Sequence, residues 1–486
     1  MRQPYLAIIS LLILTGCVVG PDYRRPDYPT PPQFRGETAE TPMAPVSLGE
    51  LAWWQVFEDE QLQELIRTAL TENYDLRIAV ARVFQARAQL IGTRANQFPF
   101  VDANADAIYN RVAGDRPPLT RQETFQPIGS LDLSFELDLW GRLRRATESA
   151  WADLLASEEA RRTVVTTLVS DVATAYFQLR ELDLELEIAR RTLESRRTAL
   201  QLVQAREKAG VASLLEVRQA ETLLYTAAAI IPTLERRIAQ TENLISVLIG
   251  CNPTAIPRGR PLLQQLALPV VPPGLPSSLL ECRPDIRQAE QQLISANAQI
   301  GVARALLFPQ VALTGSGGVG AIGVDGTFFG PQGLFAIGPL LTAPIFNSGQ
   351  LRANVAATEA QQQAALWRYL QSIQLAFREV SDALVEYRKQ REFRIQQEAL
   401  TETWQDALRL ANERYEGGVT SFLEALDTER ELFSAELTLA QAQLAERVAI
   451  VRLYRALGGG WQMESAPMQS PLQVHAAGAK QRALQR

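Results

Sequence analysis

The residues that could carry chemistry in this chain are few, and their types exclude the common catalytic arrangements. The 486 residues include one histidine, His475, which lies in a C-terminal stretch rich in proline, glutamine and alanine. Histidine is the usual base of a catalytic triad and a frequent zinc ligand. We therefore predict no enzymatic activity, no metal site and no cofactor. The net charge of −6 provides no basic surface for nucleic acid, which we exclude as a partner.

Cys17 is the residue most clearly marked for modification. An apolar run from Leu6 to Leu14 leads into Leu14-Thr15-Gly16-Cys17, and this run is too short to span a bilayer as a helix. Small residues directly before a cysteine resemble a bacterial lipobox. We predict a lipoprotein signal peptide over residues 1–16 and covalent diacylglycerol and N-acyl chains on Cys17, which would bind outer-membrane lipid. The alternative is an ordinary signal peptide with a chance cysteine.

Two acidic residues, Glu424 and Asp427, are one helical turn apart and so share a helix face. Paired carboxylates can perform acid–base catalysis, but no nucleophile or pocket-forming motif accompanies them. Repeated around a pore axis, they would form rings that attract cations and exclude anions. The alternative is a solvated outer helix face.

A glycine-rich motif, Gly318 to Gly323, matches the GxGxxG pattern of dinucleotide-binding sites. That pattern requires a helix immediately after it. Here Val324-Asp325-Gly326 and Gly330-Pro331 follow, which do not favour a helix. We therefore reject a dinucleotide site and predict a loop on the outer surface.

These residues belong to a chain with two similar halves. Gly210 to Glu216 returns as Gly418 to Glu424, and Phe98-Pro99 returns as Phe308-Pro309, at an offset of about 208 to 210. So long an offset indicates duplication of a half-protein. The predicted organisation is a proline-rich tether over 17–50, a first repeat over 51–250, a proline-rich connector over 251–282, a second repeat over 283–460 and a disordered tail over 461–486. Cys251 and Cys282 border the connector, and a disulfide between them or two separate thiols are equally compatible with the sequence.

Each half has the same predicted order of elements. A helix, at about 60–96 or 284–306, ends at Phe-Pro and is followed by two strands, a long helix, a glycine break and a second long helix. The long segments, Gly141 to Lys208 and Gly349 to Glu416, contain no proline, and each would be ~100 Å long at 1.5 Å per residue. Apolar residues in them alternate between spacings of three and four, which favours coiled-coil packing. A soluble helical bundle would give the same spacing.

Four segments are predicted to be β-strands. Gly129 to Trp140 alternates strictly between apolar and polar residues, which is typical of a membrane strand between lipid and water. The others are Val101 to Ile108, Gln310 to Val319 and Phe335 to Phe346. Four strands cannot close a barrel, and an open sheet edge is not tolerated in lipid. We therefore expect three copies to share a twelve-strand barrel; the alternative is soluble hairpins packed on the helices.

Three motifs indicate a family: Cys17 to Tyr23, Arg283 to Glu290, and Arg414 to Asp427. With them the chain resembles the TolC-like outer membrane factors, specifically the lipidated OprM/NodT type. This resemblance implies an α+β membrane protein, a homotrimer with a twelve-strand barrel in the outer membrane and a twelve-helix tunnel in the periplasm. It also implies a periplasmic adaptor and an inner-membrane pump of the resistance-nodulation-division type as partners. Substrates would pass through unchanged.

The hairpin turns are the predicted working parts. Gly210 and Gly418 would supply turns with positive φ, and Ser213 and Ser421 would cap the following helices. By resemblance, the adaptor docks on these tips, which we assign to Gly210, Val211, Ser213, Gly418, Val419 and Ser421. The resemblance also implies a periplasmic gate made by Leu423, Glu424, Asp427, Glu216 and Tyr415.

The predicted function is therefore the outer-membrane exit duct of a tripartite efflux system for small toxic compounds or drugs. Two alternatives are the exit duct of a type I protein secretion system and, in a different class, a structural lipoprotein with a helical stalk.

Overall fold

The computed structural model describes residues 18–32, 34–35, 48–112, 122–264, 276–325 and 327–460. The predicted signal peptide, Cys17 and the predicted tail over 461–486 lie outside these residues. The chain divides into two compact units. The sheet unit comprises Met1–Tyr28, Arg82–Glu158 and Gln288–Gln371, and the hairpin unit comprises Pro29–Ala81, Glu159–Arg287 and Ser372–Arg486.

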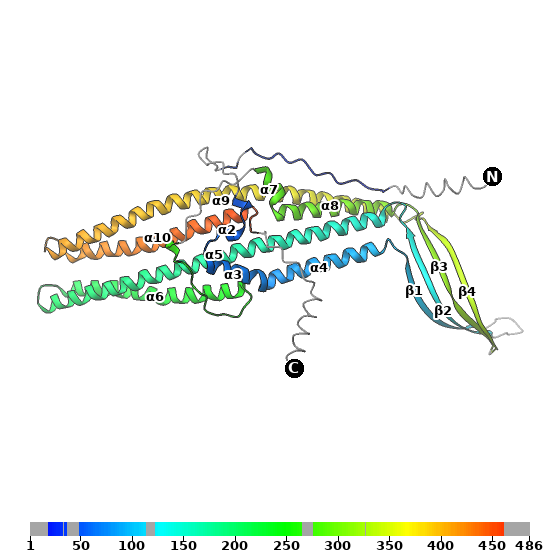
Figure 1. The fold of residues 1–486 in the computed structure, drawn as a ribbon, viewed down its shortest axis with the longest axis horizontal. Helices are drawn as coiled ribbons and strands as arrows, with labels where there is room; N and C mark the ends of the chain where they lie inside the picture. Colours follow the sequence, from blue (N-terminus) through cyan, green and yellow to red (C-terminus); the bar gives the residue numbers. More distant parts are fainter. Residues whose placement is uncertain are drawn as a thin grey trace. The chain divides into compact units, whose positions relative to one another are not determined.

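The predicted order of elements is confirmed in both halves of the chain (Figure 1). The first half contains α3 (Glu60–Glu72), α4 (Tyr74–Ala95), β1 (Phe100–Val112), β2 (Gln122–Leu137), α5 (Arg142–Lys208) and α6 (Leu214–Leu248). The second contains α8 (Pro284–Ala305), β3 (Gln310–Val324), β4 (Thr327–Thr342), α9 (Gln350–Glu416) and α10 (Phe422–Ala456). The short elements are η1 (Leu48–Glu50), α2 (Trp53–Val56), η2 (Leu262–Gln264) and α7 (Pro276–Cys282). Among the described helices, none combines the length and apolarity that a membrane crossing requires.

The helix predicted over 60–96 is in fact two helices, which meet at Asn73. This residue has extended backbone, with ψ of 131°. Its side-chain oxygen accepts a hydrogen bond from the Leu76 N–H at 3.0 Å, and its amide donates to the Leu248 carbonyl at 2.9 Å. Asparagine competes with the helix for backbone partners, and here it caps α4 and ties it to the end of α6. The segment predicted as the connector contains η2 and α7.

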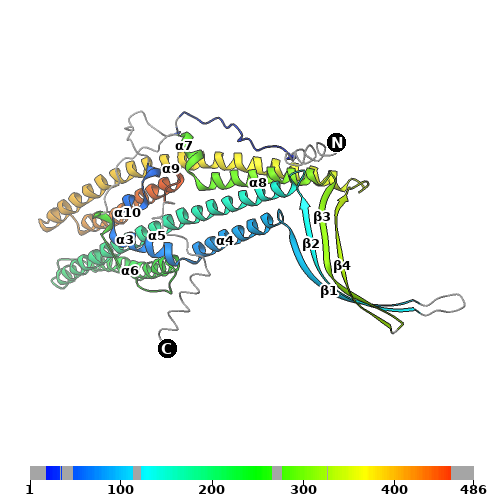
Figure 2. The same cartoon turned by 45° about the vertical axis from the view of Figure 1, so that its right-hand side comes forward.

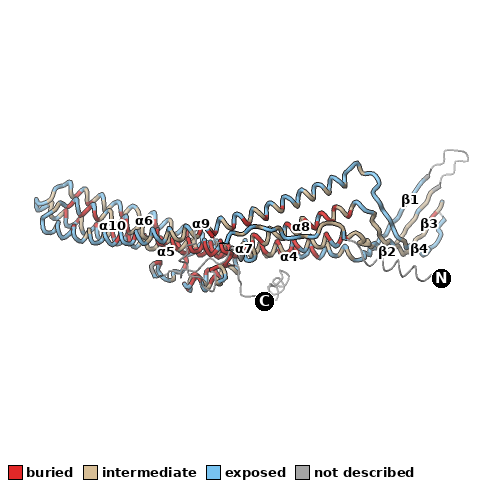
Figure 3. The backbone as a smooth tube through the Cα atoms, turned by 90° about the horizontal axis from the view of Figure 1, so that it is seen from above, coloured by how far each residue is buried: buried red, intermediate tan, exposed pale blue. Residues whose placement is uncertain are grey.

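The four strands form one antiparallel sheet in the order β1-β2-β3-β4, curved in both views (Figures 1 and 2). The register pairs Asp132 with Asp102 on one side and with Ser316 on the other, so these polar residues share a face. Leu131 alternates to the opposite face, where it is 59% exposed. Figure 3 shows the sheet mostly in the colours of exposed and intermediate residues. One face is therefore polar, and the other carries apolar side chains that the sheet unit leaves uncovered.

The loop predicted for Gly318 to Gly323 is wrong, because these residues lie inside β3. A side chain at Gly318 would meet the Gly129 carbonyl oxygen at 2.1 Å. The glycines of this motif thus let the backbones of β2 and β3 approach closely, and the register shifts between Gly320 and Ile322. β2 and β4 begin at Gln122 and Thr327, earlier than predicted. The prediction relied on alternating polarity, and the first residues of these two strands do not alternate.

In the sheet unit, the residues directly after Cys17 run as an extended strap along the helices. The Val19 N–H donates to the Trp140 carbonyl at 3.0 Å. Asp22 forms an ion pair with Arg145 at 2.7 Å. Gly20 lies so close to α8 that a side chain there would meet the Gly301 Cα at 2.5 Å. Glycine at both positions is what allows the strap to bind.

The hairpin unit is held by apolar side chains from paired helices. Its largest core joins α2, α3, α5 and the ends of α6 and α10, with Leu62, Tyr176 and Tyr454 among its fully buried members. Figure 3 shows buried residues concentrated in helices, in contrast to the sheet. Cys251 and Cys282 are both exposed free thiols, so the disulfide alternative is not realised.

Candidate functional site at the hairpin tips

The two glycine turns are built as the sequence predicts. Gly210 and Gly418 have φ of +74° and +73°, a conformation that glycine adopts without strain. In the first turn the Val211 N–H donates to the Arg206 carbonyl at 2.9 Å, which closes the helix end in a Schellman-type turn. The second turn repeats this bond between Val419 and Arg414 at 2.9 Å.

The two helices that follow the turns begin differently. The Ser213 hydroxyl accepts from the Glu216 N–H at 3.3 Å, and the Glu216 carboxylate accepts from the Ser213 N–H at 3.2 Å. This reciprocal capping box satisfies two N–H groups at the start of α6. Ser421 occupies the same position before α10, but its side chain makes no capping hydrogen bond. The predicted side-chain cap at Ser421 is therefore wrong. Instead, the Thr420 hydroxyl donates to the Glu424 carboxylate.

Apolar side chains at the predicted docking tips are exposed. Val211 is 67% exposed and Val419 is 73% exposed, and Leu215 beside the first turn reaches 66%. Behind them the two hairpins pack on one another through a buried cluster of α5, α6 and α10, consisting of Leu200, Val203, Val217, Ala220, Phe422 and Leu426. The tips thus present apolar surface on a firmly packed base.

The predicted gate carboxylates lie on the first turns of α10 and are about half exposed. The Glu424 Oε1 lies 3.8 Å from the Arg414 Nη1, and the Asp427 Oδ1 lies 3.3 Å from the Arg430 Nη1. Exposed pairs of this kind contribute about 0–1 kcal/mol each. Leu423, which directly precedes Glu424, is 50% exposed. Three of the predicted gate residues, Leu423, Glu424 and Asp427, therefore lie together at the start of α10.

Tyr415 and Glu216, the other two predicted gate residues, have separate partners. The Tyr415 ring lies 5.1 Å from the Phe422 ring, and the Arg206 guanidinium carbon lies 4.8 Å from the centre of the Tyr415 ring. The Tyr415 hydroxyl is buried, and no hydrogen-bond partner for it exists among the described residues. Glu216 is engaged in capping its own helix. Arg206 thus joins the two hairpins at the tip, a contact that the sequence analysis missed.

A buried ion pair between the hairpins was also missed. The Arg196 Nε lies 3.3 Å from the Glu429 Oε1, and its side chain is 2% exposed. The Arg196 Nη1 also donates to the Leu223 carbonyl at 2.7 Å. Burial raises the pKa of Glu429, and Arg196 lowers it. A signal existed, since Arg196 continues the seven-residue spacing of Leu182, Ala189 and Val203 along α5.

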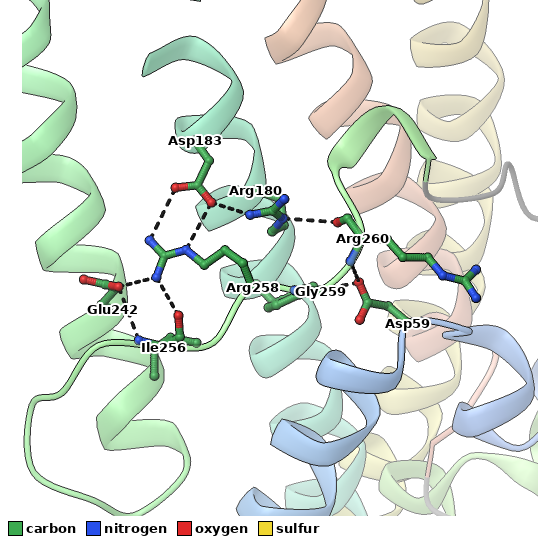
Figure 4. Close-up of polar contacts among 9 residues, drawn as sticks. Asp59, Arg180, Asp183, Glu242, Ile256, Arg258, Gly259 and Arg260 are labelled. Carbon is green, nitrogen blue, oxygen red and sulfur yellow. Dashed lines mark hydrogen bonds and ion pairs between the residues drawn. The ribbon is translucent and has the colours of Figure 1, made fainter. Parts of the chain in front are cut away.

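The base of the first hairpin is held by an ionic network around Arg258 (Figure 4). The Arg258 Nε lies 3.2 Å from the Asp183 Oδ2 of α5, and its Nη1 bonds to Glu242 of α6. Two residues after Arg258, the Arg260 N–H donates to the Asp59 Oδ2 at 3.0 Å. The loop after α6 therefore fixes α5, α6 and the start of α3 to one another. Within the described residues, no group of three or more histidine, cysteine, aspartate or glutamate side chains could hold a metal ion.

The family described as "Outer membrane efflux protein" matches residues 65–251 and 275–459. The solvent efflux pump outer membrane protein SrpC of Pseudomonas putida is 40% identical over 473 residues, which are 95% of this chain and 99% of SrpC. The probable outer membrane lipoprotein SilC of Salmonella typhimurium is 35% identical, over 94% of this chain and 98% of SilC.

The fold matches solved structures as well. The outer-membrane channel OprN superposes with a TM-score of 0.84 at 34% identity, and the match covers 92% of this chain and all of OprN. The family match extends over both halves, and the similarity to SrpC covers nearly the whole chain. The chain therefore belongs to the outer membrane efflux protein family.

Proposed function

We propose that three copies of this chain form a passive exit duct in the outer membrane, gated at its periplasmic tips, for a tripartite efflux system. The family is one of outer membrane efflux channels, and its members are not enzymes.

The observation that carries the proposal is the four-stranded sheet. Its apolar face exposes Leu131, and in β4 Phe335 and Leu341 are 81% and 66% exposed. Its outer strands, β1 and β4, each pair with one neighbour only among the described strands. In lipid, the free backbone groups of such edges would be unsatisfied at a cost of several kcal/mol each. Pairing β1 of one copy with β4 of the next removes every edge, and three copies give a twelve-strand barrel.

The proposed partner proteins are inferred from the exposed apolar residues at the hairpin tips and from the names of the relatives. An apolar tip surface that includes Val211 and Val419 suits docking by the helical hairpin of a periplasmic adaptor. SrpC and TtgI are named for solvent and toluene efflux pumps. We propose that this chain likewise receives small toxic compounds through an adaptor and an inner-membrane pump of the resistance-nodulation-division type.

The lipid anchor is proposed on Cys17, with diacylglycerol and an N-acyl chain. The lipobox in the sequence and the relative SilC, named as a lipoprotein, support it. So does the strap, because Val18 packs against Gly141, where the sheet passes into α5. An anchor attached one residue earlier would sit close to the membrane end of the helices.

Two measurements test the proposal on the full, lipidated chain. Native mass spectrometry of the detergent-solubilised protein should give a trimer, and the trimer should conduct ions in planar bilayers. A stable monomer, or a trimer that never conducts, would contradict it. Deleting the gene from its host should sensitise the cells to apolar solvents or drugs. Loss of protein secretion without such sensitivity would favour a type I secretion duct.

A further inference from the structure

Two glutamates of α5 are buried where α5 packs against α6 and α10, remote from the tip residues discussed above. Glu181 and Glu185 are one helical turn apart and only 1% and 3% exposed. Leu182, between them, belongs to a buried apolar cluster with Leu234 of α6 and Phe433 of α10. Acidic side chains are rarely buried so fully unless they are paired with positive charge.

The positive charge near this pair is too small to neutralise both carboxylates. The Glu185 Oε2 lies 3.4 Å from the Nη1 of Arg237 on α6, and Arg237 is 40% exposed. The Glu185 Oε1 accepts from the Gln441 amide of α10 at 2.8 Å. Glu181 is in hydrogen-bonding contact with Glu185, and the charged groups that act on it are Glu185 and Arg237. Its Oε2 is buried and has no hydrogen-bond partner in the described part of the chain.

Two ionised carboxylates cannot hydrogen bond to one another, because both only accept. In such a pair one carboxyl retains its proton and donates it to the other. Burial, followed by the hydrogen bond and charge of Glu185, raises the pKa of Glu181 to about 8, although Arg237 opposes the rise. Glu181 therefore loses its proton only at near-neutral to mildly alkaline pH.

We propose that Glu181 and Glu185 form a proton-binding site that couples the packing of α10 against α5 and α6 to pH. With one proton bound, the pair carries a single negative charge, which Arg237 and Gln441 satisfy. When that proton is lost, a second charge appears inside an apolar cluster. The Gln441 contact and the packing of Phe433 then weaken, and the second hairpin loosens from the first.

The site occurs in the first half of the duplicated chain only. At the offset of 208 residues that relates Gly210 to Gly418, Glu181 and Glu185 correspond to Lys389 and Phe393. The response to pH is therefore expected in the contact of α10 with α5 and α6. This inference deepens the proposed gated duct by naming a regulator of it, the proton concentration of the surrounding medium.

The sign of the effect on stability follows from the raised pKa of Glu181. In the unfolded chain this group ionises near 4.5, so the stability it contributes is present below that pH and is lost as pH rises to about 8. The melting temperature of the full chain in detergent should fall over this range. Glu181→Gln, which keeps the hydrogen bond but cannot ionise, should remove part of that fall. Glu187→Gln, on the exposed side of the same helix, should leave it unchanged.

Hairpin separation provides a second readout that does not depend on conduction. Spin labels at Ser195→Cys of α5 and Ser434→Cys of α10, in a chain whose Cys251 and Cys282 are serines, should move apart between pH 6 and about 9. Glu181→Gln should abolish the movement. Equal pH profiles of melting and label distance in the wild-type chain and Glu181→Gln would overturn the proton site. A pH-dependent distance in a protein that never conducts would support the site and count against the duct.

Discussion

At the scale of single residues, the two acidic side chains at the tip of the second hairpin each form an ion pair with an arginine. Glu424 and Asp427 point their charges at Arg414 and Arg430, across 3.8 and 3.3 Å. Only the Glu424 pair joins two different helices, because Arg414 lies on α9 and Asp427 shares α10 with its partner. In a trimer the same carboxylates would also repel their copies around the axis. The ion pair within each hairpin and the repulsion between copies of a trimer would thus act on the same atoms.

Neutralising both carboxylates, by Glu424→Gln with Asp427→Asn, should raise single-channel conductance in planar bilayers and weaken cation preference. If each Glu424–Arg414 pair contributes about 0.5 kcal/mol to the closed tip, its loss in three copies shifts the ratio of closed to open tips about tenfold. Glu413→Gln removes an exposed acid on α9 that pairs with Arg409, and it should leave both quantities unchanged. Unaltered conductance and ion preference in the double variant would refute the gate role.

At the scale of elements, the sequence predicted those features that depend on local pattern. The long helices α5 and α9 end at Lys208 and Glu416 as predicted, because a glycine with positive φ follows each. The break at Asn73 and the missing cap at Ser421 were not predicted, since they depend on which backbone group each side chain meets. The Arg196 and Glu429 pair joins residues 233 positions apart, so no local pattern could have named the partner. The role of the predicted gate residues stays a prediction.

The strap of the sheet unit depends on a glycine inside a helix. Gly301 lies in α8, where glycine is unfavourable by about 1 kcal/mol relative to alanine. A Cβ at this position would meet the Val19 carbonyl oxygen and the Arg145 Cγ, both at 2.8 Å. Glycine at this position thus lowers the helix propensity of α8 but allows the strap to pack closely against it.

Gly301→Ala should therefore destabilise the chain by roughly 1–3 kcal/mol, despite its better helix propensity. Limited proteolysis should then cut within residues 18–28, which the strap contacts protect in the wild type. Gly92→Ala in α4 is the matched control, because a Cβ there meets nothing within 4 Å and should stabilise slightly. Equal effects of the two substitutions would mean that the strap adds no stability.

At the scale of the whole molecule, the sheet has two chemically different faces. On the polar face, the Asn104 amide and the Ser130 hydroxyl both donate to Asp132, at 2.5 and 3.0 Å. These bonds hold a carboxylate where water can reach it. Such an aspartate suits a wet lumen, while the opposite face, with Leu131 and Phe335, suits lipid. A soluble hairpin packed on helices would bury one face, and neither face of this sheet is buried.

An arginine can distinguish the two faces. In lipid near the bilayer midplane it costs about 2–4 kcal/mol per strand, whereas in a water-filled lumen it is tolerated. Leu131→Arg places it on the apolar face, and Ser134→Arg places it on the polar face of the same strand, so both variants add the same charge to β2. We expect Leu131→Arg to reduce the trimer recovered from outer membranes severalfold, because the cost recurs in all three copies, and Ser134→Arg to assemble normally with weaker cation preference. If Ser134→Arg were the variant that failed to assemble, the faces would be assigned the wrong way round. If both assembled equally well, the sheet would not lie in lipid, and the shared barrel would have to be abandoned.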